Sequence, residues 1–251
     1  MNVFLPRHLS VSSVALYTRC PAQWKLRYVD RLATPTSAAQ ATGIAFHKAL
    51  EAEHLGHDSE RAWIAAANGI EASLAASGQT MTMTKLDGLT LLNVYRDRGF
   101  GGMRGHPERK FVLPFPSRSI PVPLLGFIDL VIPDEREYWD WKTTGGSYWT
   151  QAKVDLEPQK EAYGWAYQQL HRHRAQRARW IIFNTRKMTV ESYETVPSPD
   201  GFRLFEMQAE ATWQGIVEQR YDGCGECPEL CKPPADKPSN GPSFDWEEAT
   251  P

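Results

Sequence analysis

Three residues on either side of one turn have the types and spacing for metal-dependent phosphodiester chemistry: Asp129, Asp140 and Lys142. The turn signal between them is Pro133-Asp-Glu-Arg136, so a simple hairpin pairs residue 132 with 137 and Asp129 with Asp140. Directly paired residues point to the same sheet face, with Cβ atoms about 4.5–5.5 Å apart. Lys142 lies two residues beyond Asp140 and shares that face. We therefore expect two carboxylates and one ammonium group on one patch.

Two opposed carboxylates repel each other, and a divalent cation between them reverses that effect. Hard oxygen ligands suit Mg²⁺ or Mn²⁺. Such an ion polarises a phosphoryl oxygen and makes water a nucleophile near neutral pH. Lys142 would orient the water or stabilise developing charge. The alternative is a Lys142 that only neutralises Asp140 on an exposed sheet face, so the hairpin alone leaves catalysis open.

Further candidate residues lie before and after this hairpin. Gln159 and Tyr163 are four residues apart in an expected helix and share one of its faces. His47 lies in a helical segment that begins Gly43-Ile-Ala-Phe-His47. A lone histidine with apolar neighbours is usually only packed, and a Gln and a Tyr at this spacing are common by chance. Position relative to the hairpin therefore decides their interpretation.

The four cysteines are Cys20, Cys224, Cys227 and Cys231. Clustered cysteines in a cytosolic protein indicate metal ligation more than disulfide bonding. Four thiolates suffice for a [4Fe-4S] cluster or a Zn²⁺ ion. A link from Cys20 to the C-terminal three would close almost the whole chain and restrict the unfolded ensemble.

Helical and strand patterns alternate in an order that predicts an α/β domain, with a mixed central sheet flanked by helices. The expected helices cover about 10–28 (restarted at Pro21), 43–54, 59–76, 83–98, 157–173 and 199–220, and the expected strands 110–115, 124–132, 137–142, 180–184 and 189–196. Residues 31–42 and 143–155 are expected to be loops.

The chain of 251 residues has 41% hydrophobic and 23% charged residues and a formal net charge of -2, typical of a globular protein. Any phosphate-binding surface must therefore be local. One candidate runs from His171 to Arg174 with Arg177 and Arg179, although a solvated helix end explains it equally well. No membrane-spanning run or signal peptide is visible, so we expect a cytoplasmic protein of a bacterial or phage-infected cell.

Gly126-Phe-Ile-Asp129 followed by Asp140-Trp-Lys142 resembles the core of the PD-(D/E)XK nuclease superfamily. The Gly43-X-X-X-His47 helix and the Gln159-X-X-X-Tyr163 motif resemble those of RecB-type members. Residues 10–28, which contain Cys20, resemble the opening of RecB-like nucleases with an iron–sulfur cluster, among them the Cas-four family, its phage relatives and the AddB nuclease domain. The resemblance implies a restriction-endonuclease-like core with a metal-cluster staple that joins the N- and C-terminal segments.

The resemblance also implies roles for individual residues. His47, Asp129, Asp140 and the main-chain carbonyl of Trp141 would hold the metal, and Lys142 would assist attack. Gln159 and Tyr163 would contact DNA. The cysteines Cys20, Cys224, Cys227 and Cys231 would hold a [4Fe-4S] cluster. The gap from Cys227 to Cys231 is shorter than in those members, which keeps Zn²⁺ as the alternative. Family members often keep a glutamate near the position of Glu108, but we expect Glu108 to be solvated.

The predicted organisation is one nuclease domain over 1–231 and a disordered tail over 232–251. Within the domain, 9–28 and 221–231 form the cysteine region, 43–105 a mainly helical insertion and 106–220 the catalytic core. The predicted function is hydrolysis of single-stranded or frayed DNA ends by an exonuclease in recombination, phage DNA processing or CRISPR adaptation, beside recombination or integration proteins. The alternatives are a catalytically inactive DNA- or partner-binding module on the same fold, and a zinc-stapled protein without nuclease activity.

Overall fold

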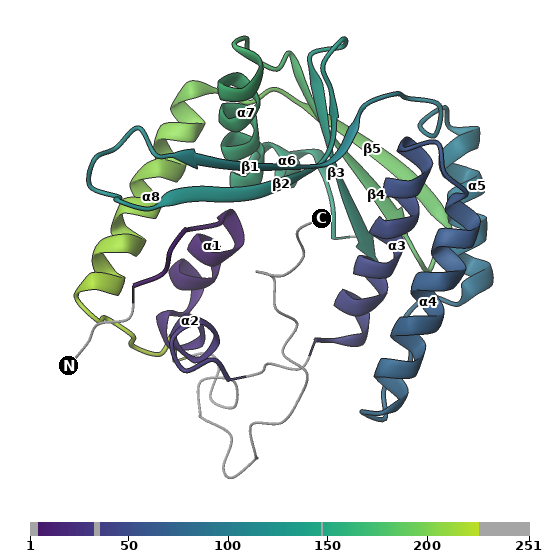
Figure 1. Ribbon diagram of the computed structural model, residues 1–251, viewed down its shortest axis with the longest axis horizontal. Helices are drawn as coiled ribbons and strands as arrows, with labels where there is room; N and C mark the ends of the chain where they lie inside the picture. Colours follow the sequence, from purple (N-terminus) through teal and green to yellow (C-terminus); the bar gives the residue numbers. More distant parts are fainter. Residues whose placement is uncertain (1–4, 33–35, 147, 226–251) are drawn as a thin grey trace. The chain divides into compact units, whose positions relative to one another are not determined.

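The computed structural model describes residues 5–32, 36–146 and 148–225. Its sheet has five strands in the order β1-β2-β3-β4-β5 (Figure 1). The strands are β1 (His106–Pro114), β2 (Pro123–Ile132), β3 (Glu137–Thr144), β4 (Arg177–Asn184) and β5 (Thr189–Thr195). β2 and β3 are antiparallel, β3 and β4 parallel, and β4 and β5 antiparallel. The mixed sheet predicted from the sequence is confirmed.

The described residues include α1 (Val11–Arg19), α2 (Pro21–Tyr28), α3 (Ala38–His54), α4 (Ser59–Ala75), α5 (Lys85–Asp97), α6 (Gln151–Asp155), α7 (Pro158–His171) and α8 (Pro199–Val217). Pro21 begins a new helix, as expected, because a proline lacks the N–H that a helix interior needs. No helix in these ranges is long and apolar enough to cross a membrane.

Two segments expected to be loops contain helix because a hydroxyl side chain caps each one. Ser37 accepts a hydrogen bond from the N–H of Gln40, so α3 begins at Ala38 rather than at Gly43. Thr150 accepts from the N–H of Lys153 and starts the short helix α6. The expectation that 31–42 and 143–155 are entirely loops is therefore wrong.

The chain forms two compact units, of which the larger contains residues 36–113 and 125–205. Consecutive residues of β3 face opposite sides of its sheet. Trp139 and Trp141 join the buried cluster formed with α3, α4 and α5, which includes Phe46, Leu50, Trp63, Leu91, Tyr95 and Phe183. Tyr138 points the other way, where its hydroxyl donates to the carbonyl of Lys160 on α7. The strand that carries the candidate site is therefore packed on both faces.

The described part of the smaller unit contains residues 5–32, 114–124 and 206–225. Leu9 forms a parallel bridge to Leu124, and its N–H donates to the carbonyl of Pro123 at 3.0 Å. The hydroxyl of Tyr17 donates to the carbonyl of Arg220. These contacts bring the described N-terminal helices and the end of α8 into one packed body.

Candidate active site

The β2–β3 hairpin has the predicted register. Ile132 pairs with Glu137, Val131 with Tyr138 and Leu130 with Trp139. These pairs end one step before Asp129 and Asp140, so the direct pairing of the two aspartates stays a prediction. Close to this point the Asp129 side chain bonds to the neighbouring backbone, because its Oδ2 accepts the N–H of Trp141 at 2.6 Å.

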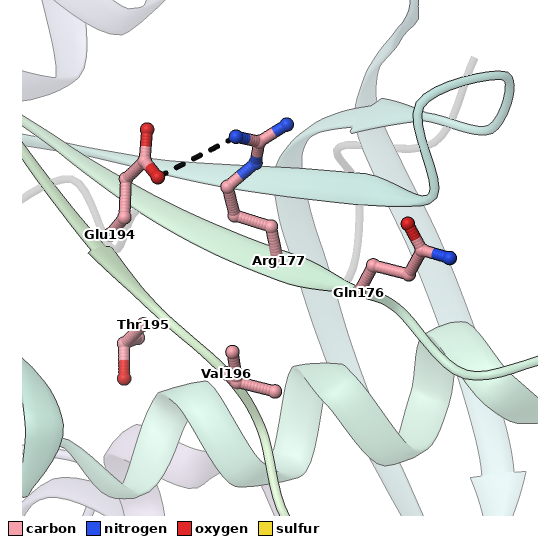
Figure 2. Close-up of a pocket in the computed structure, with 5 residues that line it drawn as sticks. All are labelled: Gln176, Arg177, Glu194, Thr195 and Val196. Atoms are coloured by element: carbon pink, nitrogen blue, oxygen red, sulfur yellow. Dashed lines mark ion pairs between the residues drawn. The ribbon is translucent and has the colours of Figure 1, made fainter.

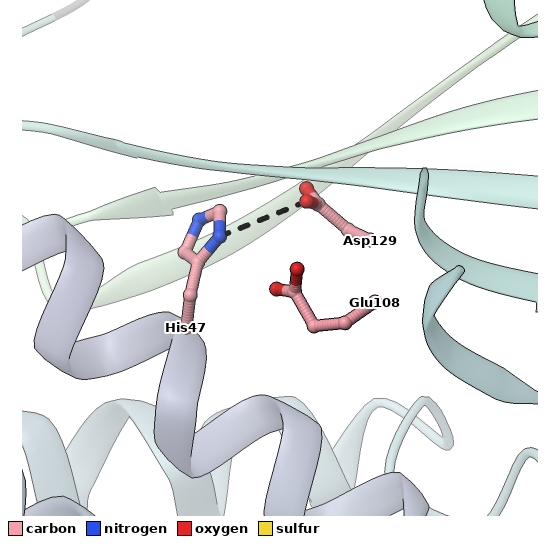
Figure 3. Close-up of side chains that lie close together, drawn as sticks. All are labelled: His47, Glu108 and Asp129. Atoms are coloured by element: carbon pink, nitrogen blue, oxygen red, sulfur yellow. Dashed lines mark ion pairs between the residues drawn. The ribbon is translucent and has the colours of Figure 1, made fainter. Parts of the chain in front are cut away.

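Three side chains from three different elements converge beside this hairpin (Figure 3). His47 comes from α3, Glu108 from β1 and Asp129 from β2. One ligand atom of each lies within 4.8 Å of those of the other two, which makes the group a candidate metal site. His47 Nδ1 is 3.8 Å from Asp129 Oδ1. The structure therefore brings together two of the predicted metal ligands and adds a glutamate.

Glu108 is half-buried in this group, so the expectation of a solvated side chain is wrong. Its φ is 48°, in the left-handed region that residues with a Cβ rarely occupy. Such a conformation costs about 1–3 kcal/mol and occurs preferentially where it directs a side chain into a functional site. The sequence marked Glu108 only by its position, because simple alternation along a strand does not predict a left-handed residue.

Gly43 lets α3 pack close enough to β3 for His47 to reach the site. A Cβ on Gly43 would lie 2.9 Å from Thr143 Oγ1, so glycine allows α3 to approach β3 closely. His47, one turn later, contacts the ring of Trp141 edge-on, with centroids 5.8 Å apart. The Gly43-X-X-X-His47 spacing therefore has a packing cause in this fold.

Asp140 and Lys142 form the other half of the site. Lys142 Nζ is 2.6 Å from Asp140 Oδ2, and the Asp140 side chain has 0% exposure. Neither Asp140 oxygen has a hydrogen-bond partner of regular geometry among the described residues. Asp140 is not one of the three residues whose ligand atoms converge, so its predicted role as a ligand stays a prediction.

The helix after the hairpin brings Gln159 to Lys142. Lys142 Nζ donates to Gln159 Oε1 at 3.1 Å. Tyr163, one turn further along α7, is only 7% exposed. Its ring packs edge-on against Phe111 and Tyr138, with centroids 5.8 and 6.4 Å apart. Gln159 thus contacts Lys142, whereas Tyr163 is mostly packed; contacts of either with DNA stay a prediction.

Burial dominates the electrostatics of the site. It raises the pKa of both Asp129 and Asp140 to about 6, although the Lys142 ammonium opposes the rise. Burial and the Asp129 carboxylate raise the pKa of Glu108 to about 7. Burial, with Lys142, lowers the pKa of His47 to about 4, so the imidazole is neutral at pH 7. Each shift disfavours charge in the metal-free protein, and a bound cation would reverse it for the carboxylates.

The residues present fit a divalent cation. A neutral imidazole nitrogen and two carboxylate groups converge, and in the part of the chain that the structure describes the buried Asp140 carboxylate has the Lys142 ammonium beside it but no hydrogen bond of regular geometry. Mixed oxygen and imidazole ligands suit Mn²⁺, and the carboxylates also suit Mg²⁺. The Trp141 carbonyl, predicted as a further ligand, belongs to a residue whose N–H already orients Asp129.

The predicted cysteine site is only partly within the described residues. Cys20 is buried at the end of α1, and Cys224 is half-buried. Cys227 and Cys231 lie outside the described residues. The Trp24 ring stacks on that of Tyr221, with centroids 6.1 Å apart, so the segments on either side of Cys20 and just before Cys224 approach each other. The joining of these segments by a metal cluster stays a prediction.

The predicted local basic surface is largely neutralised at two of its positions. Arg177 Nε and Arg179 Nε lie 2.9 and 2.7 Å from the carboxylate oxygens of the buried Glu137. Both arginines also pair with Glu194. Figure 2 shows the Arg177–Glu194 pair in a pocket that Gln176, Thr195 and Val196 also line. These two arginines are therefore paired with carboxylates of β3 and β5 rather than available as free cations.

Comparison with known proteins identifies the family of the chain. The family model described as "PD-(D/E)XK nuclease superfamily" matches residues 8–232. The crystal structure of a "Putative exonuclease" from Eubacterium rectale has a TM-score of 0.59 at 11% identity, over 92% of this chain and 90% of that one. A structure named SSO0001 has a TM-score of 0.47 at 13% identity, over 92% and 86%, which is too weak to argue from. No curated protein matches the chain significantly.

Proposed function

Because the chain belongs to the PD-(D/E)XK nuclease superfamily and has its mixed-sheet, restriction-endonuclease-like fold, we propose that it is a metal-dependent DNA exonuclease. One observation carries the proposal. His47, Glu108 and Asp129 converge from three elements beside the buried Asp140–Lys142 pair. A structural sheet face has no need to collect three buried or half-buried carboxyl groups.

His47, Glu108 and Asp129 would hold the cation, with Asp140 as a further ligand when Lys142 moves toward substrate. When bound, Mg²⁺ or Mn²⁺ supplies positive charge against a phosphoryl oxygen and lowers the pKa of a neighbouring water. Trp141 fixes the Asp129 carboxylate through its N–H. Lys142 places an ammonium group where negative charge develops, and Gln159 limits the directions in which Lys142 can point.

The substrate proposed is DNA with single-stranded or frayed ends. It rests on the resemblance to RecB-type motifs, and the name of the E. rectale structure agrees with an exonuclease. Gln159 and Tyr163 would lie along the strand near the scissile phosphate. From the same resemblance we propose that the protein acts in recombination, phage DNA processing or CRISPR adaptation. Its partners would be the integration or recombination proteins of those processes.

The experiment compares linear DNA, labelled at the 5′ or the 3′ end and single- or double-stranded, with closed circular single strands. We expect Mn²⁺- or Mg²⁺-dependent release of nucleotides from a linear form and intact circles. Asp134→Ala, in the exposed hairpin turn, is the matched control for Asp129→Ala. Cleavage of the circles would show that the protein is an endonuclease, because a closed circle has no end for an exonuclease. Failure to degrade any form would support an inactive binding module on this fold.

We further propose that Cys20, Cys224, Cys227 and Cys231 hold a [4Fe-4S] cluster, with Zn²⁺ as the alternative. The approach of Trp24 to Tyr221 supports this, because it draws the two cysteine segments together. Anaerobically purified protein should absorb broadly in the visible range and contain about four irons per chain. One zinc per chain and no colour would favour Zn²⁺. Protein that contains neither iron nor zinc would refute the site. Cys20→Ser should lose the metal and the colour.

A further inference from the structure

A second histidine of α3, His54, lies on the same helix face as His47, because seven residues are close to two turns. His54 is 9% exposed and does not belong to the group of converging ligands. Its ring stacks on that of Trp141, with centroids 5.5 Å apart and an interplanar angle of 16°. His47 contacts the same indole edge-on. The Trp141 side chain is therefore in contact with one metal-site histidine and one buried histidine.

Two hydrogen bonds fix the His54 ring. Nδ1 lies 2.8 Å from the carbonyl oxygen of Met103, and Nε2 lies 2.6 Å from the Tyr95 hydroxyl. A carbonyl oxygen only accepts, so Nδ1 carries the proton. Nε2 then accepts the hydroxyl proton of Tyr95. Both ring nitrogens of a neutral imidazole are thereby satisfied, and the ring plane cannot rotate without breaking both bonds.

The backbone of Trp141 connects its side chain to the metal site. Its N–H donates to Asp129 Oδ2 at 2.6 Å, and Asp129 Oδ1 lies 3.8 Å from His47 Nδ1. A shift of the indole would move the β3 backbone and the edge on which His47 rests. Residues that orient metal ligands in this indirect way commonly change metal affinity or activity by about 10–100-fold when replaced.

We propose that His54, held by Tyr95, is a positioning residue of the metal site that fixes Trp141 and, through it, Asp129 and His47. The inference rests on the proposed function, because it assumes that these ligands bind a cation. It adds a buried group that acts without touching substrate or metal. Its consequence is that metal affinity should depend on a hydroxyl group of α5.

The test uses Tyr95→Phe, which removes one hydroxyl and keeps the ring, and His54→Phe, which keeps a ring but removes both hydrogen bonds. Trp63→Phe is the matched control, since Trp63 belongs to the same apolar cluster and donates to the Lys85 carbonyl. Mn²⁺ dissociation constants, kcat and KM are measured on the full chain well below each variant's unfolding temperature.

We expect Tyr95→Phe to weaken Mn²⁺ binding about tenfold and to lower kcat, with KM for DNA changed less than about twofold. Trp63→Phe should lower the unfolding temperature and leave Mn²⁺ affinity unchanged. Variants that are only less stable and bind Mn²⁺ like the wild type would overturn the inference and leave the proposed function standing. A wild-type protein that binds no Mn²⁺ and cleaves no DNA would overturn both. Tyr95→Phe decides the matter if His54→Phe does not fold.

Discussion

The Lys142 ammonium group lies 2.6 Å from Oδ2 of Asp140, whose side chain has 0% exposure. Asp140 has no regular hydrogen-bond donor among the described residues, so Lys142 is the cation that stabilises its ionised form. The same ammonium group donates to Gln159 Oε1 at 3.1 Å. One lysine therefore links a buried carboxylate of β3 to the first turn of α7.

Removing this lysine should destabilise the metal-free protein. We expect Lys142→Met to lower the free energy of unfolding by about 3 kcal/mol, because a buried carboxylate is left unpaired. Asp140→Asn added to Lys142→Met should restore most of that loss. Urea denaturation in EDTA measures both. A double variant as unstable as Lys142→Met would mean that the unpaired carboxylate is not the cause.

The contact between Gln159 and Lys142 predicts a loss of activity that is separate from folding. Gln159→Leu should lower kcat about tenfold, because Lys142 loses an acceptor that limits its directions. Gln169→Leu, on the same helix, is the control. Single-turnover rates on a labelled strand measure the effect. Equal rates for Gln159→Leu and wild type would show that Lys142 needs no such restraint.

Metal binding should release protons. Burial raises the pKa of Asp129 to about 6 and of Glu108 to about 7, and a cation binds only their ionised forms. Mn²⁺ affinity should therefore rise as pH rises from about 5.5 to 8, with proton release visible in calorimetry in buffers of different ionisation enthalpy. His47 adds nothing in this range, because burial lowers its pKa to about 4. An affinity independent of pH over this range would contradict the assignment of both carboxylates.

The raised pKa values of Asp129 and Glu108 should make the metal-free protein less stable as pH rises, whereas they make metal binding stronger. Carboxyl groups whose pKa is raised on folding contribute stability below their unfolded pKa, and that contribution is lost as pH rises through 6 and 7. Metal-free protein should thus lose unfolding free energy between about pH 4 and 7, and Mn²⁺ should restore it at the upper end.

Glu108 offers a way to separate function from stability. Its φ of 48° suits glycine better than glutamate. Glu108→Gly should raise the unfolding temperature of the metal-free protein, because left-handed strain of about 1–2 kcal/mol is relieved, while Mn²⁺ binding weakens. Glu108→Gln keeps the strain and should weaken binding alone. Unchanged Mn²⁺ affinity in both variants would exclude Glu108 as a ligand.

Local sequence patterns predicted the β2–β3 hairpin. They did not predict that Glu108 would join His47 and Asp129 beside it. The Pro133–Arg136 turn set the register that pairs Ile132 with Glu137, because each step of an antiparallel pair moves one residue along both strands. The left-handed backbone at Glu108 and the stack of His54 on Trp141 arise from tertiary packing, which periodicity does not encode. For the stack of His54 on Trp141, the only signal in the sequence was the seven-residue spacing of His47 and His54, which puts both on one helix face.

For the basic segment that includes Arg177 and Arg179, composition predicted a phosphate-binding surface, but in the fold both arginines form ion pairs. Arg177 and Arg179 looked available for phosphate because their partners lie far away in the sequence. Parallel pairing of β3 with β4 places Glu137 beside Arg177, and antiparallel pairing of β4 with β5 places Glu194 opposite Arg179. Such pairs depend on sheet order, which the chain reveals only once it is folded.

The most direct test of the central claim is the single-turnover rate of hydrolysis of an end-labelled single-stranded DNA in Mn²⁺, for wild type, Lys142→Ala and the control Lys187→Ala. The account predicts cleavage by wild type that EDTA abolishes, a rate at least about 100-fold lower for Lys142→Ala, and an unchanged rate for Lys187→Ala. Equal rates for wild type and Lys142→Ala, or cleavage that persists in EDTA, would contradict a metal-dependent active site on this hairpin.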